Sequence, residues 1–278
     1  MKRKLFVAAA LLLAGAIASA QTMTSQDYLA KYQRQVKMLG ADGVGVETII
    51  DRWGEDFPED GDMLEARFLY NYLKSQSTEV VKKDAAKYLG EAPVLTLKDS
   101  TGVDVNYFQE TMFVDSLFAR SQNALDKAIA CHPEEIRFRL DKISSLFAYE
   151  KESPDLAYAE IVRMIDLNTP STPKWIYGGE LLSDDEFVDI VQDYCSNFFK
   201  LGTPNGYELF LLLSQKMNKL YPKNPSFVGN MGSYWFVGKN NYKKALSFYK
   251  KALKLDPEDI ATNRNMKILE RKMAEGKK

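Results

Sequence analysis

Apolar residues recur every three or four positions along most of this chain, the spacing of helices that bury one face. The segment 241–257 shows the pattern most clearly, because Ala245, Tyr249 and Ala252 share one face and lysines occupy much of the rest. The same spacing predicts helices over 25–39, 46–53, 62–75, 111–130, 134–149, 153–167, 183–200, 207–221, 224–236, 241–257 and 258–273.

Helix-starting residues separate these segments. Asn224-Pro225 and Asp256-Pro257 each combine a capping side chain with a proline, whose missing N–H costs nothing in a first helical turn. The stretch Ser183 to Glu186 matches a capping box, in which each end bonds the backbone N–H of the other. Proline also recurs at 58, 133, 170, 222 and 257, which predicts successive helix pairs with insertions where the interval is long.

One segment departs from the helical spacing. Residues 94–98 and 103–108 are rich in β-branched and aromatic residues, and Asp99-Ser100-Thr101-Gly102 between them is typical of a turn. We therefore predict a β-hairpin insertion at 92–110. Because an isolated two-stranded hairpin is marginally stable in water, we expect a packed insertion, with a binding arm as the alternative.

The helix pattern resembles the tetratricopeptide repeat (TPR) family at the spacing of Ala245, Tyr249, Ala252 and Pro257, and again at 128–133. The resemblance implies an all-α, TPR-like solenoid of helical hairpins over 21–278, with four to five helix pairs and a C-terminal capping helix. Its clearest unit is 224–257. The first helix of that unit departs from the family, with Gly229, Gly232 and Ser233 at the usual Trp, Leu and Gly positions.

The N-terminus has the pattern of a signal peptide over residues 1–20. Lys2, Arg3 and Lys4 precede an apolar run at 5–17, and Ala18-Ser19-Ala20 supplies the small residues of a cleavage site. We expect export to the periplasm or outside the cell, with no transmembrane segment in the mature chain. With the degenerate repeats, this leader is similar to those of exported TPR proteins of Gram-negative bacteria, Bacteroidetes especially.

Charge excludes one class of partner. Removing the leader takes away three of the 37 basic residues and none of the 38 acidic ones, so the mature chain has a net charge of −4. A nucleic-acid-binding protein is usually basic, so we expect no such partner. The hydrophobic fraction of 45% is enough for a continuous core.

Candidate catalytic residues are few. His132 is the only histidine and adjoins Cys131, but neighbours on a helix do not face each other, so we predict a helix-terminus role over a catalytic pair. We interpret Cys131 and Cys195 as separate thiols, although export permits a disulfide. Aligned with a calcium loop from Asp56, the acidic stretch 51–62 departs from it because Pro58 and Arg67 occupy ligand positions, and it is interpreted as a solvated loop between helices. We expect no metal and no cofactor.

The candidate binding residues lie in and after the clearest unit. They are Phe227, Asn230, Met231, Tyr234, Asn263 and Arg264. Since the first helices of TPR pairs line the concave face, the resemblance implies a non-catalytic module that binds a protein or peptide there. For any one of these residues we favour the alternative, in which the aromatics form core and the polar groups are only solvated. Two other functions stay open: an envelope hydrolase with paired carboxylates, or a structural subunit of an envelope assembly.

Overall fold

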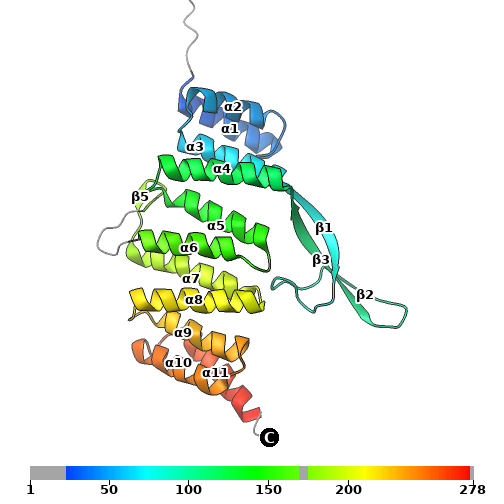
Figure 1. Cartoon of the computed structure of the whole chain (residues 1–278), viewed down its shortest axis with the longest axis vertical. Coiled ribbons are helices and arrows are strands. Elements are labelled where there is room, and N and C mark those ends of the chain that lie inside the picture. The colour runs from blue at the N-terminus through cyan, green and yellow to red at the C-terminus, as the bar shows by residue number, and fades with distance from the viewer. Residues whose placement is uncertain (1–22, 169–174, 276–278) are drawn as a thin grey trace, which may run out of the picture.

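The computed structural model describes residues 23–168 and 175–275, so the predicted signal peptide 1–20 and Pro170 lie outside the described residues. The described chain is mostly helical with a small antiparallel sheet (Figure 1), which confirms that helices dominate the fold. None of these helices is long and apolar enough to cross a membrane. The helices are α1 (Ser25–Leu39), α2 (Val46–Asp56), α3 (Gly61–Lys74), α4 (Asp115–Cys131), α5 (Ile136–Glu150), α6 (Asp155–Leu167), α7 (Asp184–Lys200), α8 (Pro204–Leu220), α9 (Pro225–Ser233), α10 (Tyr242–Leu255) and α11 (Ile260–Glu275).

Helices that follow one another in the chain pack side by side and build one elongated stack (Figure 1). The helices can be paired as α1 with α2, α3 with α4, α5 with α6, α7 with α8 and α9 with α10. α8 packs as closely on α9 as on α7, and α11 packs on α9 and α10. A helix with one apolar stripe can bury it only against a neighbour, so each pair in such a stack is stabilised by the next.

Two large clusters of buried side chains run through the stack. The first joins α1 to α4 around Trp53, which is fully buried. The second runs from α4 to α9 and includes Phe187 and Phe198. Tyr72 of α3 packs against both clusters, so the core continues from one to the other.

The sheet lies between α3 and α4 in the chain. Its strands, in the spatial order β1-β3-β2 with antiparallel neighbours, are β1 (Gln76–Lys83), β2 (Leu95–Lys98) and β3 (Asp104–Phe113). The predicted hairpin is present as β2 and β3, with Leu97 opposite Val105. The Asp99 N–H donates to the Val103 carbonyl at 2.9 Å and closes the turn.

The sheet is larger than the insertion predicted at 92–110. The sequence does not predict β1, because its charged and apolar residues fall on both faces and mark no buried side. Its pairing with β3, from Gln76 opposite Phe113 to Lys83 opposite Asn106, gives it strand conformation. Because β3 continues to Phe113, the helix predicted from residue 111 begins at Asp115 instead.

The part of the sheet nearest the helices is fixed to them through Glu110. Its Oε1 accepts hydrogen bonds from Lys151 Nζ at 2.6 Å and from Tyr88 Oη at 3.1 Å. Its Oε2 lies 3.7 Å from Lys83 Nζ. Burial opposes ionisation here, but the hydrogen bond and charge of Lys151 hold the pKa of Glu110 below its ordinary value. This half of the insertion is packed, as predicted.

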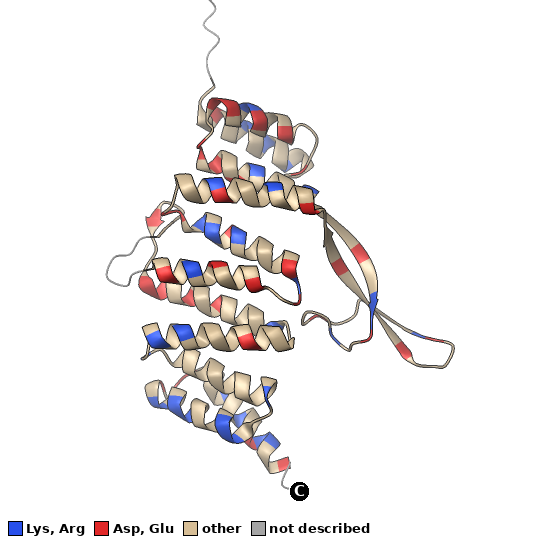
Figure 2. Cartoon of the chain, viewed as in Figure 1, with Lys and Arg blue, Asp and Glu red and all other residues tan. Residues whose placement is uncertain are grey.

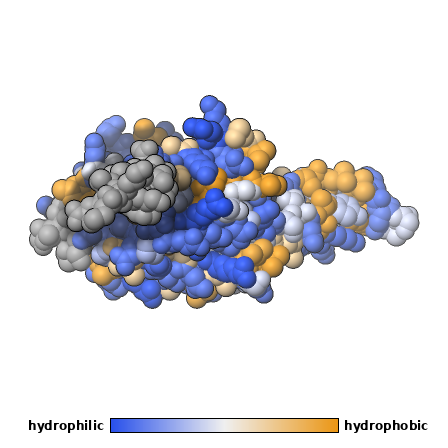
Figure 3. Space-filling model, turned by 90° about the horizontal axis from the view of Figure 1, so that it is seen from above, coloured by the Kyte–Doolittle hydropathy of each residue, from blue (hydrophilic) through white to orange (hydrophobic). Residues whose placement is uncertain are grey.

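The far half of the sheet projects away from the stack (Figure 1). Leu95, Leu97 and Val103 are 48%, 48% and 60% exposed there. Seen from above, apolar residues colour much of this projecting arm (Figure 3). A binding role for the arm stays a prediction.

The C-terminal helix boundaries also differ from the predicted ones. α9 ends at Ser233 and continues as a π-helical turn, η1 (Tyr234–Gly238). The ring of Tyr249 presses on α9 so closely that a Cβ on Gly232 would lie 2.5 Å from it. α11 begins at Ile260 rather than at 258. The Asp259 carboxylate accepts the N–H groups of its first turn, a capping role that the sequence assigned to Asp256.

A further hairpin, which was not predicted, consists of two strands of two residues each, β4 (Ile176–Tyr177) and β5 (Glu180–Leu181).

Candidate functional site

Three of the predicted binding residues lie in the core. Phe227, Met231 and Tyr234 are 0%, 7% and 3% exposed. Phe227 and Met231 belong to α9 and Tyr234 begins η1, and both elements pack against α8 and α10, so the apolar stripe is covered on both sides. The alternative interpretation, that these aromatic and apolar residues are core, is therefore correct, and they are not available to a partner.

The polar candidates mostly bond within the chain. Asn230 Nδ2 donates to Gln192 Oε1 at 2.8 Å, and its Oδ1 accepts from Gln192 Nε2 at 3.3 Å. Asn263 Nδ2 donates to the carbonyls of Pro257 and Asp259 at 2.9 and 3.0 Å. Of the six, only Arg264 is exposed. The predicted residues therefore do not form a shared binding surface.

A groove of about 600 Å³ lies at the other end of the stack, between α2 and α4 and over α3. This volume falls in the range of ordinary ligand sites, roughly 300 to 1,000 Å³. Its walls are α2 and α4, which are the second helices of their pairs. The predicted binding site is on the concave face, which the first helices of the pairs would line. The groove therefore lies on a different surface.

The two walls run in the same direction. Tyr70 Oη, near the end of α3, donates to Glu47 Oε2 at the start of α2 at 3.1 Å, so α2 and α3 are antiparallel. The Val114 N–H donates to the Ser75 carbonyl at 2.7 Å, which places the start of α4 beside the end of α3. Residues at corresponding depths on α2 and α4 therefore face each other across α3.

The residues that line the two walls carry opposite charges. Outside the groove lining, α4 also carries acidic residues (Figure 2). Glu47, Asp51 and Glu55 recur at four-residue steps and line one side of the groove, whereas Arg120 and Lys127 line the other. All five residues are exposed, and no ion pair among the described residues joins α2 to α4. The two rows of charge therefore do not neutralise each other directly.

The floor combines apolar side chains with one arginine. Arg67 Nη2 donates to the Ile50 carbonyl at 3.2 Å and to Asp51 Oδ1 at 3.3 Å, while its Nε is buried without a partner in the described residues. Beside it, burial and then the hydrogen bond to Glu47 raise the pKa of Tyr70. The apolar part of the lining is Ile50, Met63, Leu64 and Ala124.

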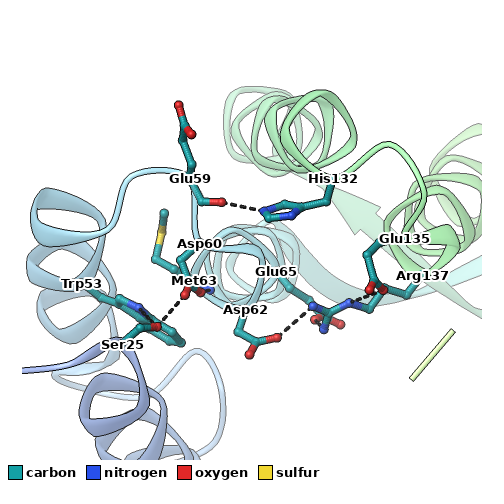
Figure 4. Close-up of polar contacts among 10 residues, drawn as sticks. All are labelled: Ser25, Trp53, Glu59, Asp60, Asp62, Met63, Glu65, His132, Glu135 and Arg137. Carbon is teal, nitrogen blue, oxygen red and sulfur yellow. Dashed lines mark hydrogen bonds and ion pairs between the residues drawn. The ribbon is translucent and has the colours of Figure 1, made fainter. Parts of the chain in front are cut away.

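A network of polar contacts sets the position of the turn between α2 and α3 (Figure 4). Trp53 Nε1 donates to Ser25 Oγ at 3.1 Å, and Ser25 Oγ donates to Asp60 Oδ2 at 2.5 Å. Asp60 Oδ1 accepts the Met63 N–H at 2.9 Å and caps α3. These bonds join α1, α2 and α3 and so hold the acidic wall in place.

His132 has the helix-terminus role that was predicted. It follows the last residue of α4, and its Nε2 lies 2.6 Å from the Glu59 carbonyl (Figure 4). This contact ties the end of the basic wall to the turn that follows the acidic wall. Cys131 and Cys195 are free thiols, as interpreted from the sequence, and burial raises the pKa of Cys195 to about 12.

A carboxylate cluster lies beside this network. Arg137 ion-pairs with Asp62 at 2.9 Å and with Glu65, and Glu135 is 3.6 Å away (Figure 4). Burial, with a smaller effect of Glu65, raises the pKa of Asp141 to about 6. The acids Asp62, Glu65 and Glu135 of this cluster are paired with Arg137. No group of acids, histidines or cysteines in the described chain has the arrangement of a metal site.

Sequence reasoning missed the groove because it treated 51–62 as a solvated loop. Asp51, Glu55 and Asp56 belong to α2, which runs past the predicted end at 53. The four-residue spacing of Glu47, Asp51 and Glu55 is visible in the sequence and could have shown an acidic helix face. Its opposition to α4 is not visible there. No protein-family model, curated protein or solved structure matches the chain.

Proposed function

We propose that this chain is a non-catalytic, exported binding protein with a TPR-like array, and that it holds a protein or peptide segment in the groove between α2 and α4. The observation that carries the proposal is the pair of oppositely charged walls over a partly apolar floor. Complementary charges on a partner would fix its position and speed its association more than they would add affinity.

The packing of the C-terminal unit supports the TPR-like assignment. Ala245, Tyr249 and Ala252 are all fully buried, with the two alanines at points where a larger side chain would separate the helices. Five helix pairs with α11 on the last pair also agree with the four to five pairs and capping helix that the resemblance implies. Export rests on the composition of residues 1–20.

The hydrolase alternative fits the groove poorly. Glycoside hydrolysis needs two carboxyl groups on opposite sides of the scissile bond, about 5 to 9.5 Å apart. In the groove the carboxylates of Glu47, Asp51 and Glu55 share one wall, and the opposite wall is basic.

A structural subunit of an envelope assembly is the second candidate. The projecting arm favours it, because Leu95, Leu97 and Val103 expose apolar surface that an assembly could cover. The groove and the arm are separate surfaces, so an experiment can tell the two functions apart.

Site-specific photo-crosslinking in the native host separates these functions. A photoreactive residue would replace Asn123 in the groove, Thr96 on the arm, or Lys219 on α8 as a control, all three of which are exposed. Binding in the groove predicts a discrete protein or peptide adduct from position 123. The adduct should disappear when Arg120→Glu and Lys127→Glu are added. Adducts from position 96 alone would favour the assembly, and equal adducts from 219 would contradict the groove.

A further inference from the structure

We propose, on the basis of the function above, that the groove binds an extended peptide segment of about five residues in which basic and acidic side chains alternate. The partner is thus defined by its charge pattern and backbone conformation. The argument depends on the spacing of the wall charges, their opposition, and which of them are already paired.

The spacing of the acidic wall matches an extended chain. Glu47, Asp51 and Glu55 are each four residues apart, which at 1.5 Å per residue gives steps of about 6 Å. In an extended peptide, alternate side chains are about 6.6 Å apart. Three alternate side chains of one extended segment could therefore each meet one of these carboxylates.

The opposition of the walls matches the alternation of such a chain. Successive side chains of an extended peptide point to opposite sides. If one set faces Glu47 and Glu55, the other set faces Arg120 and Lys127. Basic residues on the first side and acidic residues on the second would then be paired with the wall charges near the two ends of the groove. A peptide with its charges in two blocks would have both signs on each side, so one acidic side chain would face the acidic wall and one basic side chain the basic wall.

The middle of the groove places a weaker charge requirement on the peptide than its two ends do. Asp51 is already paired with Arg67, and the residue between Arg120 and Lys127 on the basic wall is the neutral Asn123. The exposed amide of Asn123 can donate to and accept from a peptide backbone. The charge requirement is therefore strongest at the two ends, as in the sequence Lys-Glu-Ala-Glu-Lys.

Binding of two matched peptides to the full mature chain tests this pattern. The probes are fluorescein-labelled, end-blocked Lys-Glu-Ala-Glu-Lys and its block isomer Lys-Lys-Ala-Glu-Glu, compared by fluorescence anisotropy at low salt. We expect the alternating peptide to bind about 10-fold more tightly, and its affinity to fall as salt screens the walls. Equal affinities for the two peptides would overturn the proposal.

Charge reversal of the walls gives the sharper test. Glu47→Lys with Glu55→Lys, or Arg120→Glu with Lys127→Glu, should each weaken binding of the alternating peptide about 10-fold. Exchanging all four charges should restore it, because the peptide can bind in the reverse direction. Lys250→Glu with Lys254→Glu on α10 is the matched control and should change nothing. Circular dichroism would show that each variant is folded, and failure of the fourfold exchange to restore binding would contradict the proposal.

The two proposals can fail separately. If position 123 still forms its discrete adduct but the block isomer binds as well as the alternating peptide, only the alternating pattern is wrong. If the adduct is absent and neither peptide binds, the groove is not the binding site and both proposals are wrong.

Discussion

The backbone of Gly54 lies directly against the guanidinium of Arg67: a Cβ at position 54 would stand 2.7 Å from Nη2. The absence of a side chain on α2 at this point leaves the space in which Arg67 reaches the Ile50 carbonyl and Asp51. The floor of the groove therefore depends on one glycine in its wall.

Gly54→Ala should weaken peptide binding while leaving global stability nearly unchanged. Alanine favours a helix interior by about 1 kcal/mol over glycine, and displacement of Arg67 should offset that gain. In an Arg67→Ala background nothing is displaced, so the same substitution should then stabilise the protein by about 1 kcal/mol. Urea denaturation of the wild type, the two single variants and the double variant measures the stability change caused by Gly54→Ala in each background. An equal gain in both backgrounds would show that the two residues do not interact.

Asp141 should make stability fall as pH rises. Burial raises its folded-state pKa to about 6 from the ordinary value of 3.8, so between these pH values the folded state holds a proton that the unfolded state has lost. Below this window the group costs nothing, and above it the buried charge costs about 3 kcal/mol. Asp141→Asn should therefore stabilise the protein at pH 7.5 and have little effect near pH 4, as measured by urea denaturation. The exposed Asp189→Asn is the control and should show no such difference.

Glu110→Gln should loosen the sheet without unfolding the stack. The substitution removes the charge that Lys151 and Lys83 pair with, at a cost of about 1–2 kcal/mol for these partly buried bonds. Amide exchange should then accelerate about 10-fold in β1 and β3 and remain unchanged in α7 and α8. Glu79→Gln is a matched control, because Glu79 is directly opposite Glu110 in the sheet but exposed. Equal acceleration by both substitutions would contradict the role of Glu110.

The two thiols should react at different rates. Cys195 is fully buried and its pKa is raised by burial, whereas Cys131 is partly exposed. Because the thiolate is the reactive form, a thiol reagent should label Cys131 in the native protein and both residues only in denaturant. Mass spectrometry after labelling counts the modified sites. Recovery of a disulfide from protein purified without reductant would contradict two free thiols.

Local sequence determined the helices well, because its signals are local contacts. The predicted helix 25–39 matches α1 in full, and the capping box at Ser183 and Glu186 is present. Hydrogen bonds between residues three or four apart stabilise both features, so the residues that form them are visible together in the sequence. The β2–β3 hairpin was predictable for the same reason.

The tertiary structure alone decided which surfaces are free. Whether Phe227 and Tyr234 bind a partner or fill the core depends on α8 and α10 closing over α9. Strand β1 exists through its pairing with β3, more than twenty residues away. The groove brings Glu47 and Arg120 to opposite sides of α3, although 73 residues separate them in the chain. Hydrophobic spacing gives each helix a buried face, but only the packing of distant segments determines what covers that face and which charges face each other.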